Sequence, residues 1–132
     1  MSGQPIEILL VEDDDLDAEA CRRALRKQFV DANLHLAGDG AEALQLLRER
    51  ARQSGMNDVL VFLDLNMPGM NGHEFLAELR ADVELQRTIV FVLTTSDHDR
   101  DIQMAYEQNV AGYFLKSEID SLIAAISGMQ WT

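Results

Sequence analysis

Five short apolar segments alternate with five segments of helical periodicity, and this alternation limits the fold more than any other feature of the chain. The apolar segments are rich in β-branched residues and are predicted strands at 6–11, 33–37, 58–63, 88–93 and 112–115. After each of them, apolar residues recur at the spacing of one helix face. These positions are Cys21, Ala24 and Leu25; Leu44, Leu47 and Ala51; Phe75, Leu76, Leu79 and Val83; Ile102, Ala105 and Tyr106; and Ile119, Leu122, Ile123 and Ile126.

Strict alternation of strand and helix predicts an α/β fold, in which helices cover both faces of a parallel sheet through right-handed crossovers. The first, third and fourth apolar segments are hydrophobic almost throughout, as in strands that are buried on both sides. We therefore expect a flavodoxin-like (βα)5 arrangement, a doubly wound parallel five-stranded sheet with strand order 2-1-3-4-5.

The composition limits the organisation and the partners of the chain. Its 132 residues, 47% of them hydrophobic, predict one domain over 1–132, with a core at about 6–127 and no output domain. A net charge of −12 opposes direct binding to nucleic acid or to anionic lipid. A lone cysteine excludes an internal disulfide, and we find neither a signal peptide nor a membrane-spanning segment. We expect a reduced cytoplasmic protein.

Polar side chains follow four of the five predicted strands. They are Glu12 and Asp13 after the first strand, Asp64 after the third, Thr94 and Thr95 after the fourth, and Lys116 after the fifth. In an open parallel sheet, ligands bind outside the carboxyl ends of the strands, where the strand order reverses. Three carboxylates at that edge favour a hard cation, and Mg2+ suits a shallow site because it keeps several of its waters.

The acidic run "LVEDDDLD" at 10–17 needs an explanation, because two charges about 4 Å apart repel by roughly 4 kcal/mol at an effective dielectric of 20. Asp14, Asp15 and Asp17 lie where the first helix begins, so we expect them to cap free amides and to meet the positive end of the helix dipole. The run alone is compatible with capping only or with capping plus a metal site.

The segment "VFLDLNMPGMNG" favours a ligand site. Asp64 leaves a buried strand and is separated from the third helix by a Pro/Gly loop, so a helix-capping role fits it poorly. Taken singly, Thr94 fits a β-branched strand end and Lys116 fits a solvated surface lysine. Taken together, a metal and an ammonium would neutralise a phosphoryl group and the hydroxyl would bind one of its oxygens. The pattern predicts a phosphoryl site.

Four motifs in this order resemble the receiver domain of bacterial two-component response regulators: "VEDD", "FLDLNMPGMNG", "VLTTS" and "GYFLKS". The resemblance extends from Ile6 to about Ile126. It implies that Asp64 accepts a phosphoryl group from the phosphohistidine of a sensor histidine kinase.

The same resemblance implies a role for each remaining site residue. Asp13, Asp64 and the backbone carbonyl of Asn66 would bind Mg2+, and Glu12 would act mainly through metal-bound water. Thr94 and Lys116 would contact the phosphoryl oxygens, and the side chain of Tyr113 would follow Thr94.

The chain length, the "NVAGYFLK" segment and the missing output domain are similar to stand-alone receivers that serve phytochrome-type histidine kinases. One residue departs from the receiver pattern, since Ser117 stands where receivers usually carry a proline, often after a cis bond. A cis peptide before serine would cost roughly 3–4 kcal/mol, so we expect a trans path.

Three alternatives differ in class from a working receiver. A pseudo-receiver would act only by protein–protein interaction, and Ser117 is its sole support. A Mg2+-dependent phosphohydrolase of the haloacid dehalogenase type needs a second aspartate where this chain has Asn66. A flavodoxin needs a Ser/Thr/Gly-rich loop where this chain has acids. We therefore expect no enzyme activity beyond Mg2+-dependent self-phosphorylation and slow autodephosphorylation.

A receiver without an output domain must signal through its surface. We expect the face formed by the fourth helix, fifth strand and fifth helix to reach a downstream protein target and to pair two chains as a symmetric homodimer. Met104 on the fourth helix and the apolar residues Met129 and Trp131 of the tail are candidates for that interface. The alternative is that Trp131 folds back on its own helix.

Overall fold

The computed structural model describes residues 5–54, 59–67 and 69–128, and its elements alternate as the periodicity predicts. They are β1 (Ile6–Val11), α1 (Asp15–Lys27), β2 (Ala32–Ala37), α2 (Gly40–Ser54), β3 (Val59–Leu63), α3 (Gly72–Ala81), β4 (Ile89–Thr94), α4 (Asp99–Glu107), β5 (Gly112–Leu115), the 3-10 helix η1 (Lys116–Glu118) and α5 (Ile119–Ser127). The five strands form one parallel sheet in the order β2-β1-β3-β4-β5, so the predicted fold is confirmed. Asp58, predicted to begin the third strand, lies outside the described residues.

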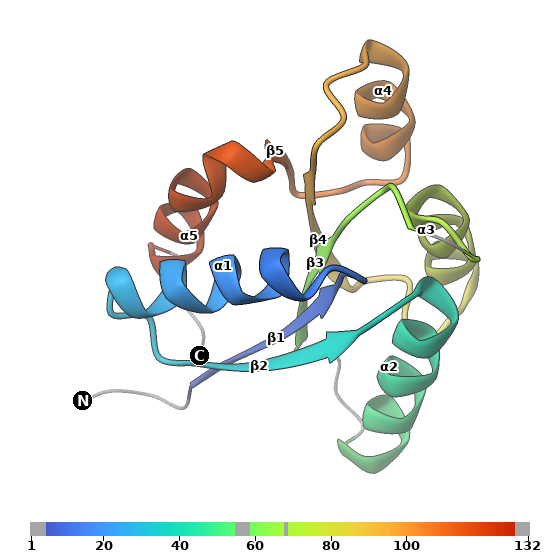
Figure 1. The fold of residues 1–132 in the computed structure, drawn as a ribbon. Helices are drawn as coiled ribbons and strands as arrows, with labels where there is room; N and C mark the ends of the chain where they lie inside the picture. The colour runs from blue at the N-terminus through green and yellow to red at the C-terminus, as the bar shows by residue number, and fades with distance from the viewer. Residues whose placement is uncertain (1–4, 55–58, 68, 129–132) are drawn as a thin grey trace.

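Helices cover both faces of the sheet, α1 and α5 on one face and α2, α3 and α4 on the other (Figure 1). Successive side chains of β1 point to opposite faces of the sheet. Ile8 and Leu10 pack with α1 and α5, and Leu9 and Val11 pack with α2 and α3. Every residue of β3 is buried, as expected for a central strand of a parallel sheet. No helix in the described part of the chain is long and apolar enough to span a bilayer.

Two of the predicted core positions are wrong. Val83 is 80% exposed, because α3 ends at Ala81 and the next residue, Asp82, is already in an extended conformation. Tyr106 is 49% exposed, because α4 turns only Ala105 fully into the core. The fourth helix is therefore held by much less apolar contact than its periodicity predicts.

Parallel register aligns the strand ends that carry the polar residues. Val11 pairs with Leu63 across β1 and β3, and the amide of Asp64 donates to the carbonyl of Val11 at 3.1 Å. On the other side of β1, the amide of Glu12 donates to the carbonyl of Ala37 at 2.9 Å. These bonds continue the ladder one residue past each strand, so both carboxylates begin from a fixed backbone.

Gly72 lets α3 begin against the loop that follows Asp64. A Cβ at this position would lie 2.6 Å from the Cα of Leu65 and 2.9 Å from the carbonyl oxygen of Asp64, closer than real Cβ contacts come. Because both neighbours are backbone atoms, the helix start would have to shift. We expect Gly72→Ala to lower the free energy of unfolding by about 1–3 kcal/mol, measured by urea denaturation.

Gly128→Ala is the matched control, since its added Cβ would come no closer than 3.8 Å to its nearest neighbour, the carbonyl oxygen of Ala125. We expect it to leave the free energy of unfolding almost unchanged. Equal stability of the two variants would contradict the close approach at Gly72.

Candidate functional site

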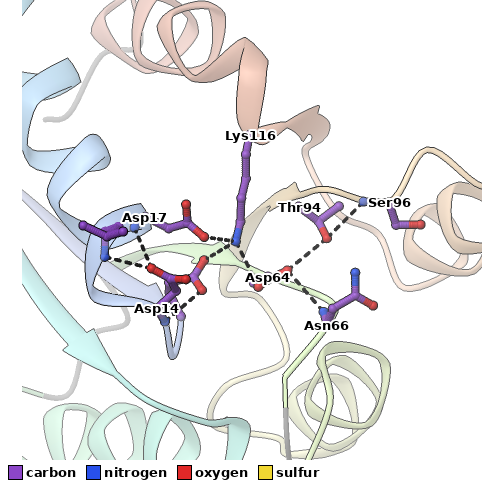
Figure 2. Close-up of polar contacts among 9 residues, drawn as sticks. Asp14, Asp17, Asp64, Asn66, Thr94, Ser96 and Lys116 are labelled. Atoms are coloured by element: carbon purple, nitrogen blue, oxygen red, sulfur yellow. Dashed lines mark hydrogen bonds and ion pairs between the residues drawn. The ribbon is translucent and has the colours of Figure 1, made fainter.

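Side chains from four strand ends meet at the carboxyl edge of the sheet. Glu12 follows β1, Asp64 follows β3, Thr94 ends β4 and Lys116 follows β5. The Thr94 hydroxyl donates to Oδ1 of Asp64 at 2.9 Å, and Nζ of Lys116 lies 3.2 Å from Oδ2 of the same carboxylate. Figure 2 shows Lys116 pointing from the end of β5 toward Asp64 and Asp17. The structure thus brings together the residues that the strand pattern singled out.

Asp64 is 3% exposed, and both of its oxygens are occupied. Besides the Thr94 hydroxyl, Oδ1 accepts the backbone amide of Asn66 at 3.1 Å, so the loop after β3 folds back on its own carboxylate. The Asn66 side chain is exposed. A carboxylate fixed at one oxygen by neutral donors and at the other by a cation has a defined orientation, as a nucleophile requires.

Lys116 contacts three carboxylates, since its Nζ lies 2.6 Å from Asp17, 2.8 Å from Glu12 and 3.2 Å from Asp64. Burial lowers the pKa of the ammonium, but its hydrogen bonds to Asp17 and Glu12 outweigh burial and hold that pKa above its ordinary value. Lys116 therefore remains protonated throughout the physiological range, and it is a fixed positive charge in the site.

Glu12 is almost fully buried, and burial raises its pKa to about 7. The hydrogen bond with Lys116 opposes this rise, and the negative charge of Asp64 adds to it. The other oxygen of Glu12 accepts the backbone amide of Asp14 at 3.1 Å. A cation bound beside this carboxyl would favour its ionised form.

Glu12, Asp13 and Asp64 each offer an oxygen within 4.8 Å of the other two. Asp13 is exposed while the other two are buried, so the cluster opens to solvent on one side. Two of these three acids, Glu12 and Asp64, also contact the Lys116 ammonium, as Asp17 does. This donor set, all oxygen and rich in negative charge, fits a hard divalent cation such as Mg2+, which keeps part of its water shell.

Some acids of the run at 10–17 cap helix α1, and others belong to the site. Asp14 is the N-cap of α1, and its Oδ1 accepts the amides of Leu16 at 2.8 Å and of Asp17 at 3.2 Å, as expected. Asp15 lies exposed in the first turn. The interpretation of Asp17 as a helix-start acid alone is incomplete, because its carboxylate also binds Lys116. No local signal identifies this contact, which joins residues 99 positions apart.

Tyr113 lies on β5, and its hydroxyl donates to the backbone carbonyl of Ser96 at 2.8 Å. Burial raises the pKa of Tyr113. Ser96 was missed by the sequence analysis, although its hydroxyl donates to Asp101 in the first turn of α4. The capping-box signal pairs a serine with an acid three residues later, so it does not identify this pair, which is five residues apart.

The loop at Ser117 follows the expected path. The described residues contain no cis peptide bond, so the Lys116–Ser117 bond is trans. Lys116 to Glu118 form the 3-10 helix η1, and the Glu118 carboxylate accepts the amide of Leu115 at 2.8 Å. The loop therefore places Lys116 at the site without the proline that receivers usually carry.

Comparison with known proteins gives a consistent result. The family of response regulator receiver domains matches residues 8–127. The chain is 34% identical over 131 residues to response regulator Rcp1 of Synechocystis, covering 98% of this chain and 89% of that protein. The solved Mn2+-bound form of Rcp1 has a TM-score of 0.78 at 32% identity and covers 95% of this chain and 94% of its own.

Two further solved structures resemble this chain. The phosphorylated cyanobacterial phytochrome response regulator RcpA has a TM-score of 0.78 at 32% identity, over 93% of this chain and 91% of that one. The bacteriophytochrome response regulator RtBRR has a TM-score of 0.81 at 34% identity, over 98% of this chain and 81% of that one. The predicted resemblance, including its narrower form, is confirmed.

The raised pKa of Glu12 predicts a pH-dependent stability. The usual pKa of a glutamate is 4.5, and that of Glu12 in the folded chain is about 7. At a pH between these two values, Glu12 holds a proton in the folded chain and has released it in the unfolded chain. Rising pH therefore favours unfolding in this window, and the free energy of unfolding should fall by about 1–3 kcal/mol from this group. Glu12→Gln cannot ionise and should lose this fall, measured by urea denaturation in EDTA at pH 5 and pH 7.5.

Glu78→Gln, on the exposed face of α3, is the matched control and should keep the wild-type pH dependence. A Glu12→Gln variant whose stability varies with pH as the wild type does would refute the assignment.

Proposed function

Because this chain belongs to the family of response regulator receiver domains, we propose that it accepts a phosphoryl group on Asp64 and transmits the phosphorylated state through its surface. One observation carries the proposal: a buried strand-end carboxylate receives the Thr94 hydroxyl on one oxygen and the Lys116 ammonium on the other, beside an acidic cluster. In this proposal residues 1–132 act as one receiver domain.

The residues of the site divide the chemistry among them. A carboxylate oxygen of Asp64 attacks phosphorus, and the bond from phosphorus to the donor's histidine nitrogen breaks, so the imidazole leaves with the bonding electron pair. The Thr94 hydroxyl and the Lys116 ammonium, which already contact Asp64, are placed to bind the phosphoryl oxygens. Asp17 and Glu12 keep Lys116 in place when Asp64 becomes an acyl phosphate.

Mg2+ is the proposed cofactor, held by Asp13, Asp64 and the backbone carbonyl of Asn66, with Glu12 acting through metal-bound water. Its support is the carboxylate cluster in this chain and the Mn2+-bound form of the relative Rcp1. When bound, the ion supplies positive charge to the phosphoryl oxygens during transfer. This chain's own contribution is to hold the donor oxygens on two fixed strand ends.

The proposed phosphoryl donor is a sensor histidine kinase in the cytoplasm. Two similar structures carry the names of a phytochrome and a bacteriophytochrome response regulator, at 32% and 34% identity. We therefore propose a phytochrome-type kinase as the partner. Asn66 at the position where a phosphohydrolase needs an acid supports a signalling role rather than turnover.

The output surface is proposed to be the face of α4, β5 and α5, where a downstream protein target binds. Tyr113 joins this face to the site through Ser96, and Tyr106 is exposed on α4. Pairing of two chains on the same face stays a prediction. The tail residues Met129 and Trp131, which were assigned to that interface, lie outside the described residues.

Acetyl phosphate with Mg2+ tests the phosphorylation directly. Intact-mass spectrometry of the wild type should show the addition of one phosphoryl group, and Asp64→Asn should abolish it because an amide cannot act as the nucleophile. Asp15→Asn, an exposed acid of the neighbouring helix, is the control and should be modified as the wild type is. Asp64→Asn protein that still gains the phosphoryl mass would place the nucleophile elsewhere, and an unmodified wild type would favour the pseudo-receiver.

Thermal unfolding tests the cation site. At a Mg2+ concentration one hundred times its dissociation constant, the wild type should gain about 2.7 kcal/mol of stability by mass action. Asp13→Ala should raise the melting temperature of the metal-free protein, because it removes one repelling carboxylate, and should lose the Mg2+ response. Asp15→Ala should keep that response. A Mg2+ shift that Asp13→Ala leaves intact would refute the ligand assignment.

A further inference from the structure

Ser96, in the loop between β4 and α4, uses every polar atom it has. Its amide faces Oγ1 of Thr94 at 3.5 Å, and its carbonyl accepts the Tyr113 hydroxyl at 2.8 Å. Its hydroxyl donates to Oδ2 of Asp101 and accepts the amide of His98 at 3.4 Å. Thr94 in turn donates to Asp64, so this loop residue is connected to the phosphoryl site (Figure 2).

Asp101 joins this loop to a third element. Its other oxygen, Oδ1, lies 2.9 Å from Nε2 of His73, in the first turn of α3. Both side chains are mostly buried, with 21% of His73 and 27% of Asp101 exposed. The Ser96 hydroxyl and then the His73 ring hold the pKa of Asp101 below its ordinary value, so the carboxylate is charged.

We propose that His73 is a positioning residue for the phosphoryl site, acting through Asp101 and Ser96 on Thr94 and Tyr113. The inference rests on the proposed function and deepens it. His73 fixes Asp101, Asp101 orients the Ser96 hydroxyl, and the ordered loop holds the Thr94 hydroxyl on Asp64 and the Tyr113 hydroxyl on the Ser96 carbonyl. These three residues, His73, Asp101 and Ser96, form what we call a polar latch between α3, α4 and the loop.

The latch matters because α4 contributes little to the apolar core. Only Ala105 of this helix is buried among the described residues. Without a hydrogen-bond donor at position 73, Asp101 loses one of its hydrogen-bond partners, and the loop between β4 and α4 adopts more conformations. Only the molecules whose Thr94 and Tyr113 are in place bind the phosphoryl group well, so the apparent dissociation constant rises in proportion as their fraction falls.

Beryllofluoride, a phosphoryl mimic, tests the latch in the full chain with saturating Mg2+. Its dissociation constant, measured by 19F NMR titration, should rise about threefold to tenfold in His73→Leu, the loss expected for one typical hydrogen bond. His73→Gln keeps a side-chain donor and should restore most of the affinity. A role in packing alone would make glutamine no better than leucine.

His35→Leu is the matched control, because it breaks a His–carboxylate contact of the same 2.9 Å length, with Glu7 at the far edge of the sheet. It should leave the affinity for beryllofluoride unchanged. Amide exchange of Ser96 and His98 in the free protein gives a second measurement, and both should exchange faster in His73→Leu than in His73→Gln or in the wild type.

The outcomes separate this inference from the proposed function. A wild type that binds beryllofluoride, with equal affinity and equal loop exchange in His73→Leu, would overturn the latch and leave the function standing. A wild type that binds no beryllofluoride would remove the function and the positioning role together, and exchange would still show whether His73 orders the loop.

Discussion

The Lys116 ammonium is the interaction on which the site depends. Glu12 and Asp64 are both buried and lie close together, and their repulsion would be severe in an apolar interior without a compensating cation. Lys116 supplies that cation and binds Asp17 as well, so it joins the end of β5 to α1 and β1. One ammonium contacts three acidic side chains, and burial, with a smaller contribution from the charge of Asp64, raises the pKa of Glu12.

The parallel sheet explains why these groups could be found from the sequence. Apolar segments identify strands, and the residue after each strand must lie at the same edge of a parallel sheet. Glu12, Asp64, Thr94 and Lys116 were therefore predictable as neighbours before any contact was known. Strand ends are set by burial on both faces, and each observed strand begins and ends within one residue of its prediction in the described ranges.

Other parts of the site depend on contacts that the sequence does not encode locally. Asp17 looks like any helix-start acid until the fold brings Lys116 beside it. The helical periodicity of α3 identifies its apolar face but does not predict a hydrogen-bond partner for His73. The contact of His73 with Asp101 forms because α3 and α4 lie side by side. Tyr106 failed as a core prediction for a related reason, since a three-residue apolar pattern on a short helix does not determine how deeply it packs.

The shallow packing of α4 fits the signalling role that we propose, in which the chain changes its surface on phosphorylation. The helix α5 buries Leu122, Ile123 and Ile126, whereas α4 buries only Ala105, so a movement of α4 would disturb less of the apolar core than a movement of α5. Polar contacts then decide where α4 rests. Hydrogen bonds have directional geometry and can be exchanged one for another, which makes them suited to select between two positions of a loosely packed helix. A change in the hydrogen bonding of Thr94 would therefore act on α4, the α-helix that buries the fewest apolar residues among those described.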